Sequence, residues 1–300
     1  MRRIILTILV CCLLAAVCYP GTAENGGVTV KVQSETIRTD SFSMDCFRFG
    51  HGKDVLVILP GLSVDSVMNY ADAVAEAYSS LTNDFTVYVF DRRKELPVVY
   101  SVYEMAEDTA AAIRSLGPDR VCLFGASQGG MIAMTIAARY PDLVSRLILG
   151  STSACMEKEQ YRTVENWVRL AKDGNAKGLY LAFGEAIYPP DVYEQFREPL
   201  ANAAELVTDA DLHRFVILAE GMKGFDMTEQ LQRIACPVLV IGSLDDCVLG
   251  ADASERIAEH LSGRPDCELY MYNGYGHAAY DLAPDYKERI LRFLTAESAV

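Results

Sequence analysis

Apolar segments alternate with segments of helical spacing along most of the chain. Residues 54–61 (DVLVILPG) and 85–91 (FTVYVFD) are almost continuously apolar and rich in β-branched and aromatic residues, which is typical of strands buried on both faces. Residues 66–81, between them, carry apolar residues at helical spacing. We therefore expect a strand, a helix and a second strand, which is the repeating unit of a parallel sheet covered by helices.

The same alternation continues towards the C-terminus. Further strands are predicted at residues 120–125, 144–150, 236–242 and 267–272, and a half-exposed strand at residues 28–33, where apolar and polar positions alternate. Further helices are predicted at residues 103–117, 129–141, 251–261 and 285–294. The predicted fold class is α/β, with a mostly parallel, doubly wound sheet.

Residues 151–230 interrupt this rhythm. They contain no clear strand pattern and are rich in helix-forming and aromatic residues. Their place after a strand puts them at the carboxyl edge of the sheet, where open α/β sheets bind their ligands. We expect a helical cap or lid over residues 151–230, inserted into a core made of residues 24–150 and 231–300. The aromatic residues of the insertion are Tyr161, Trp167, Tyr180, Phe183, Tyr188, Tyr193, Phe196, Phe215 and Phe225.

The first residues have the features of a secretory signal. Two arginines are followed by an apolar run over residues 4–18, and Gly21, Thr22 and Ala23 supply a small-residue cleavage site. The run is shorter than the about 20 apolar residues that a spanning helix needs. We expect residues 1–23 to be removed and the mature protein to be secreted or extracytoplasmic, without a stable membrane span. An uncleaved anchor is the alternative.

Net charge and cysteine positions limit the kinds of ligand and partner that the protein is expected to bind. The formal net charge is −14, which disfavours binding to nucleic acid or to anionic membrane surfaces. Of nine cysteines, the six beyond the signal are widely scattered and form no CxxC pair, so no metal site is predicted and no disulfide pairing can be assigned. No cofactor motif is present. The expected partner is a small-molecule substrate, and the oligomeric state is left open.

Residues 125–129 (GASQG) match G-x-S-x-G between a predicted buried strand and a predicted helix. One interpretation is a tight turn that needs small residues. The other is a nucleophile elbow, in which Ser127 is held on a strained corner and the Gln128 N–H, at the start of the helix, stabilises an oxyanion. The second oxyanion donor is expected in the loop after the first buried strand, at the Leu62 N–H.

A nucleophilic serine needs a base and an orienting acid. His277 lies in a glycine-rich loop directly after the last predicted strand, and is the candidate base. Asp245 and Asp246 follow the strand at 236–242, and we favour Asp245 as the carboxylate that orients His277, with Asp246 as the alternative. The other histidines are His51 before the first buried strand, His213 in the insertion and His260 at a helix end.

From about residue 54 to residue 294 the chain resembles the α/β-hydrolase superfamily with a helical cap. The segments LVILPG, VYVFDRR, LFGASQGG, ARYPDLVSRLILGS, CPVLVIGSLDD and GYGHAAYD carry this resemblance, in the family's order. The resemblance implies a triad of Ser127, His277 and Asp245 and an acyl-enzyme on Ser127. Two departures are Pro60-Gly61, where many members have His-Gly, and DRRKELPVVYS, where many have Gly-His-Gly-x-Ser.

The resulting hypothesis is a secreted serine hydrolase, carboxylesterase-like, that cleaves a small, mainly apolar ester or amide under the aromatic cap. Within the same fold, an aminopeptidase-like or carbon–carbon bond hydrolase is the alternative, and the acidic stretch EAIYPPDVYEQFRE would bind a substrate amine. The serine at position 127 argues against the branches with an aspartate nucleophile. From a different class, a non-catalytic small-molecule-binding protein would use the same pocket.

Overall fold

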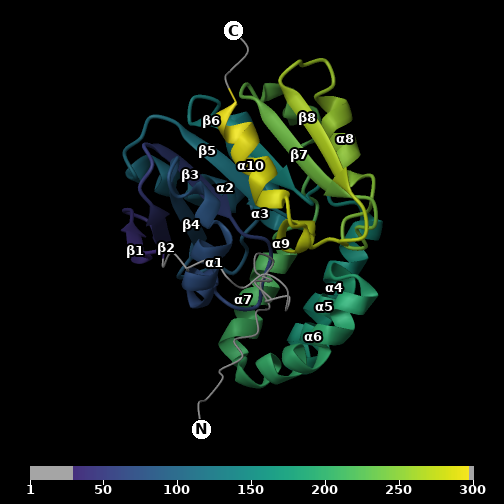
Figure 1. Ribbon diagram of the computed structural model, residues 1–300. Coiled ribbons are helices and arrows are strands. Elements are labelled where there is room, and N and C mark those ends of the chain that lie inside the picture. The colour runs from purple at the N-terminus through teal and green to yellow at the C-terminus, as the bar shows by residue number, and fades with distance from the viewer. Residues whose placement is uncertain (1–29, 297–300) are drawn as a thin grey trace, which may run out of the picture.

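The computed structural model describes residues 30–296, and within them eight strands form one sheet. Along the chain these are β1 (Gln33–Arg38), β2 (Ser43–Gly50), β3 (Asp54–Leu59), β4 (Phe85–Arg93), β5 (Val121–Ala126), β6 (Val144–Gly150), β7 (Val238–Ser243) and β8 (Cys267–Tyr272). Their order in the sheet is β1-β2-β4-β3-β5-β6-β7-β8, with β1 and β8 at opposite edges (Figure 1). The expected mostly parallel α/β fold is confirmed.

The parallel part of the sheet runs from β4 to β8. Every residue of the central strands β5 and β7 is buried, which explains why their sequences are continuously apolar instead of alternating. Parallel strands bring all their carboxyl ends to one edge. Residues that directly follow β3, β5, β7 and β8 therefore meet there.

The N-terminal edge differs from the sequence prediction. The strand predicted at residues 28–33 is wrong over 30–32, because the chain enters β1 only at Gln33 and pairs antiparallel with β2, which the pattern did not predict. The pairing with β2 runs from Gln33 opposite Arg48 to Arg38 opposite Ser43, and residues 30–32 lie outside it. Pairing between the two segments, and not periodicity alone, therefore decides which residues become strand.

Helices cover both faces of the sheet. On one face α10 (Tyr286–Thr295) packs near η2 (Ser79–Leu81), and on the other α2 (Val102–Ser115) packs against α3 (Gln128–Arg139). α8 (Ala253–His260) lies beside β7 and β8, and α9 (Ala279–Leu282) follows the loop after β8 (Figure 1). The single helix predicted at 66–81 is instead three short pieces, η1 (Val67–Tyr70), α1 (Ala71–Ala77) and η2.

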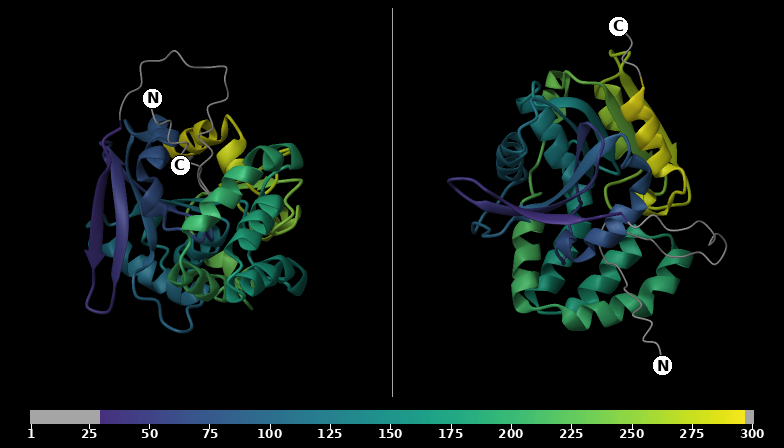
Figure 2. Two further views of the ribbon diagram at one scale, coloured as in Figure 1. Left: turned by 90° about the horizontal axis from the view of Figure 1, so that it is seen from below. Right: turned by 60° about the vertical axis from the view of Figure 1, so that its left-hand side comes forward.

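Four helices lie between β6 and β7 and form a layer beyond the carboxyl edge of the sheet (Figures 1 and 2). They are α4 (Lys158–Lys172), α5 (Ala176–Ile187), α6 (Pro190–Ala203) with the short η3 (Ala204–Leu206), and α7 (Asp209–Glu220). The chain returns to the sheet through η4 (Thr228–Arg233). We refer to α4–α7 as the cap. The expected helical insertion is therefore present.

The expected signal over residues 1–23 lies outside the described residues. Within 30–296, no helix is both long and apolar enough to cross a membrane.

Candidate active site

Ser127 occupies the sharp turn between β5 and α3. Its backbone has φ 52° and ψ −122°, a left-handed conformation that L-residues other than glycine rarely adopt and that costs on the order of 1–3 kcal/mol. The turn is held by hydrogen bonds at both sides: the Ser127 N–H donates to the Gly150 carbonyl at 2.9 Å, and the Thr152 hydroxyl donates to the Ser127 carbonyl at 2.7 Å. The Ser127 side chain does not cap α3. A strained serine whose hydroxyl is not used for capping fits the nucleophile elbow better than a plain turn.

The glycines around Ser127 are required by close backbone contacts. A Cβ on Gly125 would lie 2.2 Å from the Gly129 carbonyl oxygen, and one on Gly129 would lie 2.0 Å from the Leu59 carbonyl oxygen. A Cβ on Gly130 would lie 2.6 Å from the Thr152 side chain. The small residues thus let α3 start directly against β3 and β6, which brings the loop after β3 next to Ser127.

His277 lies in the loop between β8 and α9, and its partner is Asp246. The distance from His277 Nδ1 to Asp246 Oδ2 is 2.8 Å, and the two side chains are 1% and 3% exposed. The other carboxylate oxygen, Oδ1, accepts from the Val248 N–H at 2.8 Å and the Leu249 N–H at 3.0 Å. Three donors fix this carboxylate, and an Nδ1–H donated to it leaves His277 Nε2 as the nitrogen that can accept a proton.

The prediction that Asp245 orients His277 is wrong. Asp245 Oδ1 accepts from the Ser243 hydroxyl at 2.8 Å and the Gly274 N–H at 3.1 Å, and Oδ2 accepts from the Gly276 N–H at 2.9 Å. Desolvation by burial raises the pKa of Asp245, but these hydrogen bonds outweigh it, so the pKa lies below its usual value. Neighbouring positions in a loop point different ways, and apolar patterning carries no signal of which one meets the histidine.

Asp245 instead holds two loops together. Ser243 ends β7, whereas Gly274 and Gly276 precede His277 in the loop after β8. Gly274 and Gly276 have positive φ values of 85° and 60°, which suit glycine and turn their N–H groups towards one carboxylate. The two adjacent aspartates therefore have different contacts: Asp246 contacts the imidazole of His277, and Asp245 fixes the loop that carries His277.

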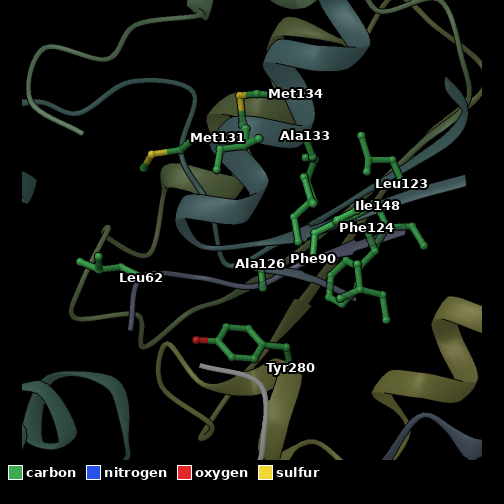
Figure 3. Close-up of a cluster of buried hydrophobic side chains, with 14 of the residues drawn as sticks. Leu62, Phe90, Leu123, Phe124, Ala126, Met131, Ala133, Met134, Ile148 and Tyr280 are labelled. Atoms are coloured by element: carbon green, nitrogen blue, oxygen red, sulfur yellow. The ribbon is translucent and has the colours of Figure 1, made fainter. Parts of the chain in front are cut away.

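The two expected oxyanion donors lie in segments that touch each other. Leu62 follows β3 and Gln128 opens α3, and both are buried. Contact between Gly129 and the Leu59 carbonyl joins these segments through the backbone. Figure 3 shows Leu62, Ala126 and Tyr280 in one buried cluster, with the Tyr280 hydroxyl turned to the side on which Leu62 lies. Tyr280 also packs edge-on against His277, with ring centroids 5.9 Å apart.

Ser127 is only 5% exposed, and the cap is joined to the core near it. The Tyr180 hydroxyl donates to Asp65 at 2.9 Å, in the loop after β3. Arg214, in α7, donates to Asp91 at 2.9 Å, near the end of β4. Ser127 is thus buried, and the next residue, Gln128, contacts the cap through the Leu218 carbonyl.

The aromatic side chains of the insertion build the cap itself. Trp167 and Phe183 have ring centroids 4.4 Å apart, and Phe183 and Phe215 pack edge to face at 6.3 Å. All three are buried. The acidic side chains of the stretch EAIYPPDVYEQFRE are exposed: Glu185, Asp191, Glu194 and Glu198. The aromatic content therefore reflects cap packing, and the acidic stretch is a solvated face that gives the aminopeptidase alternative no support.

Sequence reasoning missed Arg92. It lies near the carboxyl end of β4, is 5% exposed, and donates through one guanidinium nitrogen to the Pro60 carbonyl at 2.8 Å and to Gln128 Oε1 at 3.2 Å. The available signal was an arginine directly after an apolar strand, in the segment that departs from the family pattern. His51, His213 and His260 are exposed, whereas His277 is buried.

The six cysteines among the described residues are free. Burial raises the pKa of the Cys46 thiol to about 12 and that of Cys236 to about 11, so both are inert thiols. Within residues 30–296, no group of three or more histidine, cysteine or acidic side chains is arranged to hold a metal ion.

Comparison with known proteins supports an α/β-hydrolase fold. A family profile described as "alpha/beta hydrolase fold" matches residues 54–186. Among curated proteins, the chain is 26% identical over 238 residues to "Putative carbamate hydrolase RutD" of Rhizobium rhizogenes, which covers 75% of this chain and 88% of the relative. The protein of the same name from Caulobacter segnis is 25% identical over 258 residues, covering 81% and 92%.

Solved structures agree with this fold. The enol-lactonase from Burkholderia xenovorans superposes with a TM-score of 0.75 at 17% identity, covering 87% of this chain and 100% of the other. MGS-M2, an alpha/beta hydrolase enzyme from a Medee basin deep-sea metagenome library, superposes with a TM-score of 0.74 at 22% identity, covering 90% and 96%. Strand order, elbow, cap position and these similarities lead to one conclusion. The chain has the α/β-hydrolase fold, and its residues 54–186 match the model of that family.

Proposed function

We propose that this hydrolase is a serine hydrolase that cleaves a small ester or amide with an apolar acyl group, through an acyl-enzyme on Ser127. The observation that carries the proposal is the buried His277–Asp246 hydrogen bond at the carboxyl edge that also presents Ser127 on its strained turn. Leu62, Ala126 and Tyr280 are buried side chains in one cluster at this edge (Figure 3). A ligand that packs against such side chains would gain from an apolar acyl group, because its burial is stabilising.

The chemistry assigns one role to each group. Ser127 Oγ attacks the carbonyl carbon while its proton passes to His277 Nε2, and the Gln128 and Leu62 N–H groups stabilise the resulting oxyanion. The carbon–oxygen or carbon–nitrogen bond then breaks, and the leaving alcohol or amine takes the proton from His277. Water attacks the acyl-enzyme, again giving its proton to His277, and the carboxylic acid leaves as the proton returns to Ser127. Asp246 stabilises the imidazolium at both stages.

Labelling with a fluorophosphonate tests the nucleophile. We expect one adduct, located on Ser127 by tryptic mass spectrometry, with none in Ser127→Ala and strongly slowed labelling in His277→Ala. A panel of p-nitrophenyl esters of increasing acyl length then reports the acyl preference. A folded wild-type protein that takes no label and turns over no ester would instead support a non-catalytic binding protein.

Carbamates are the second substrate class to test. Relatives at 25–26% identity carry the name "Putative carbamate hydrolase RutD". A carbamate carbonyl would use the same nucleophile, base and oxyanion donors, because attack again produces a tetrahedral oxyanion. A higher kcat/KM for a carbamate than for the matching ester would indicate that carbamates, and not esters, are the substrate class.

We also propose that the protein is exported and cleaved after Ala23. The support is the basic start, short apolar run and small residues of the N-terminal sequence. N-terminal sequencing of the protein recovered outside the cytoplasm should begin at Glu24, whereas retention of Met1 in the membrane fraction would indicate an anchor.

A further inference from the structure

Arg92 is a buried charge close to the candidate site. Burying a guanidinium is costly unless its N–H groups are hydrogen-bonded. Here the hydrogen bonds that one nitrogen makes go to two neutral acceptors, the Pro60 carbonyl and Gln128 Oε1. A charged donor forms stronger hydrogen bonds to such acceptors than a neutral one would.

The two acceptors belong to the two segments that carry the proposed oxyanion donors. Pro60 lies two residues before Leu62, so the direction of its carbonyl limits the direction of the loop that follows. Gln128 provides its side chain to Arg92 and its backbone N–H to the oxyanion. Arg92 therefore joins the two segments of the proposed oxyanion hole through the Pro60 carbonyl and the Gln128 side chain.

The Gln128 side chain also reaches the cap. Its Nε2 donates to the Leu218 carbonyl of α7 at 2.7 Å, while its Oε1 accepts from Arg92. If the Gln128 amide were flipped, its NH2 group would face the Arg92 guanidinium and its oxygen would face the Leu218 carbonyl. Neither pair can form a hydrogen bond, so the two partners fix the orientation of the amide. A continuous set of hydrogen bonds thus runs from Pro60 through Arg92 and Gln128 to Leu218.

We infer that Arg92 is a positioning residue for the oxyanion hole, and that Gln128 couples this hole to the position of the cap. This inference rests on the proposed serine hydrolase function. When the cap is closed, Gln128 is held at both ends and the Pro60 carbonyl is fixed by Arg92. The expected consequence is that loss of Arg92 weakens binding of the tetrahedral intermediate while leaving substrate binding nearly unchanged.

The test uses Arg92→Lys, Arg92→Met and Gln128→Met, compared with the wild type on one p-nitrophenyl ester. Removing an oxyanion donor outright costs about 10²–10³-fold in kcat, so we expect displaced donors to cost about 10–100-fold, with KM changed by less than about 3-fold. Affinity for a boronic acid, which forms a tetrahedral adduct on serine, should fall by a similar factor. Binding of the matching unreactive ether should not change.

Arg214→Met is the matched control. Arg214 also joins cap and core, through Asp91, but contacts neither Pro60 nor Gln128 in the hydrogen bonds of the described residues. We expect its kcat and boronic acid affinity to stay within about 3-fold of the wild type, because the donors are not displaced. An equal loss of kcat in Arg214→Met would mean that any weakening of the cap has this effect, and would overturn the role of Arg92.

Circular dichroism and the fluorophosphonate adduct separate the outcomes. Folded Arg92 variants with wild-type kcat and boronic acid affinity would overturn the inference while Ser127 still labels. Absence of the Ser127 adduct in the wild type would instead overturn the proposed function, and this inference with it. Should Arg92→Met fail to fold, Arg92→Lys and Gln128→Met, which keep the volume, decide the question by the same readouts.

Discussion

At the scale of single residues, two adjacent aspartates have different surroundings. Asp246 is buried and meets His277, whereas Asp245 is partly exposed and accepts hydrogen bonds from Ser243 and two glycine N–H groups. Their sequence context is the same, so only their contacts separate a proposed catalytic role from a loop-fixing role. Substitution of each aspartate by asparagine should therefore affect catalysis to very different extents.

Asp246→Asn should lower kcat/KM by about 10³–10⁴-fold, because an amide cannot stabilise the imidazolium and favours the wrong histidine tautomer. Asp245→Asn should lower it by less than about 10-fold, since His277 keeps its partner. Ester hydrolysis by the two purified variants provides the measurement. A larger loss in Asp245→Asn than in Asp246→Asn would contradict the assignment made from the hydrogen bonds.

Asp245 should also leave a signature in the pH dependence of stability. Its pKa is lowered in the folded protein, so its contribution is fully present above the unfolded value of about 3.9 and is lost as pH falls through the folded pKa. We expect Asp245→Asn to reduce the free energy of unfolding by about 1 kcal/mol near neutral pH, and the difference to shrink at about pH 3. Urea unfolding of both proteins across this range measures it. A difference that stays constant with pH would exclude the carboxylate as its origin.

At the scale of elements, the elbow depends on how closely α3 approaches β3. The Gly129 Cα lies so near the Leu59 carbonyl that no side chain fits between the helix and the strand end. Ser127, between β5 and α3, takes its strained backbone from this packing, which holds the residue where an isolated turn would relax. The local fold therefore stores strain at the residue proposed to react.

Gly129→Ala should displace α3 or the loop after β3. The added Cβ would lie 2.0 Å from the Leu59 carbonyl oxygen, and relief of such a contact costs typically about 1–3 kcal/mol. We also expect fluorophosphonate labelling of Ser127 to slow, because both oxyanion segments move. Gly263→Ala, whose Cβ would have no neighbour within 4 Å, is the control for thermal unfolding and labelling. Equal behaviour of the two variants would show that the close approach does not matter.

At the scale of the whole molecule, cap and core are joined at several points around the candidate site. Tyr180 binds Asp65, Gln128 binds the Leu218 carbonyl, and the Val102 N–H donates to the Gly221 carbonyl at 3.0 Å. Several such contacts favour unfolding of cap and core together.

Joint unfolding of cap and core can be tested with Trp167, the only tryptophan in the chain, which lies buried in the cap. Its fluorescence reports the cap, whereas far-ultraviolet circular dichroism reports the helices and strands of the whole molecule. We expect the two urea transitions to coincide, because several hydrogen bonds join the cap to the core. A fluorescence midpoint at lower urea would show that the cap unfolds separately.

The fold and the type of site could be predicted from the sequence because both depend on local and periodic information. Buried parallel strands are apolar throughout, amphipathic helices show their spacing, and an elbow needs small residues at positions 125, 126, 129 and 130 around Ser127. Six strands, the cap and the strand–turn–helix at Ser127 follow from these patterns. The antiparallel edge does not, since pairing partners decide it.

What the tertiary structure alone decided concerns contacts between segments far apart in the chain. The choice of Asp246 over Asp245 depends on how the loop after β7 turns beneath His277. The role of Arg92 depends on the approach of Pro60 and Gln128 from two other strand ends. The sequence by itself determined the order of strands and helices and the small-residue turn at Ser127, because residue types and local turns define them. Only the packed carboxyl edge decided which side chains meet, since hydrogen bonds form by distance in space and not by distance along the chain.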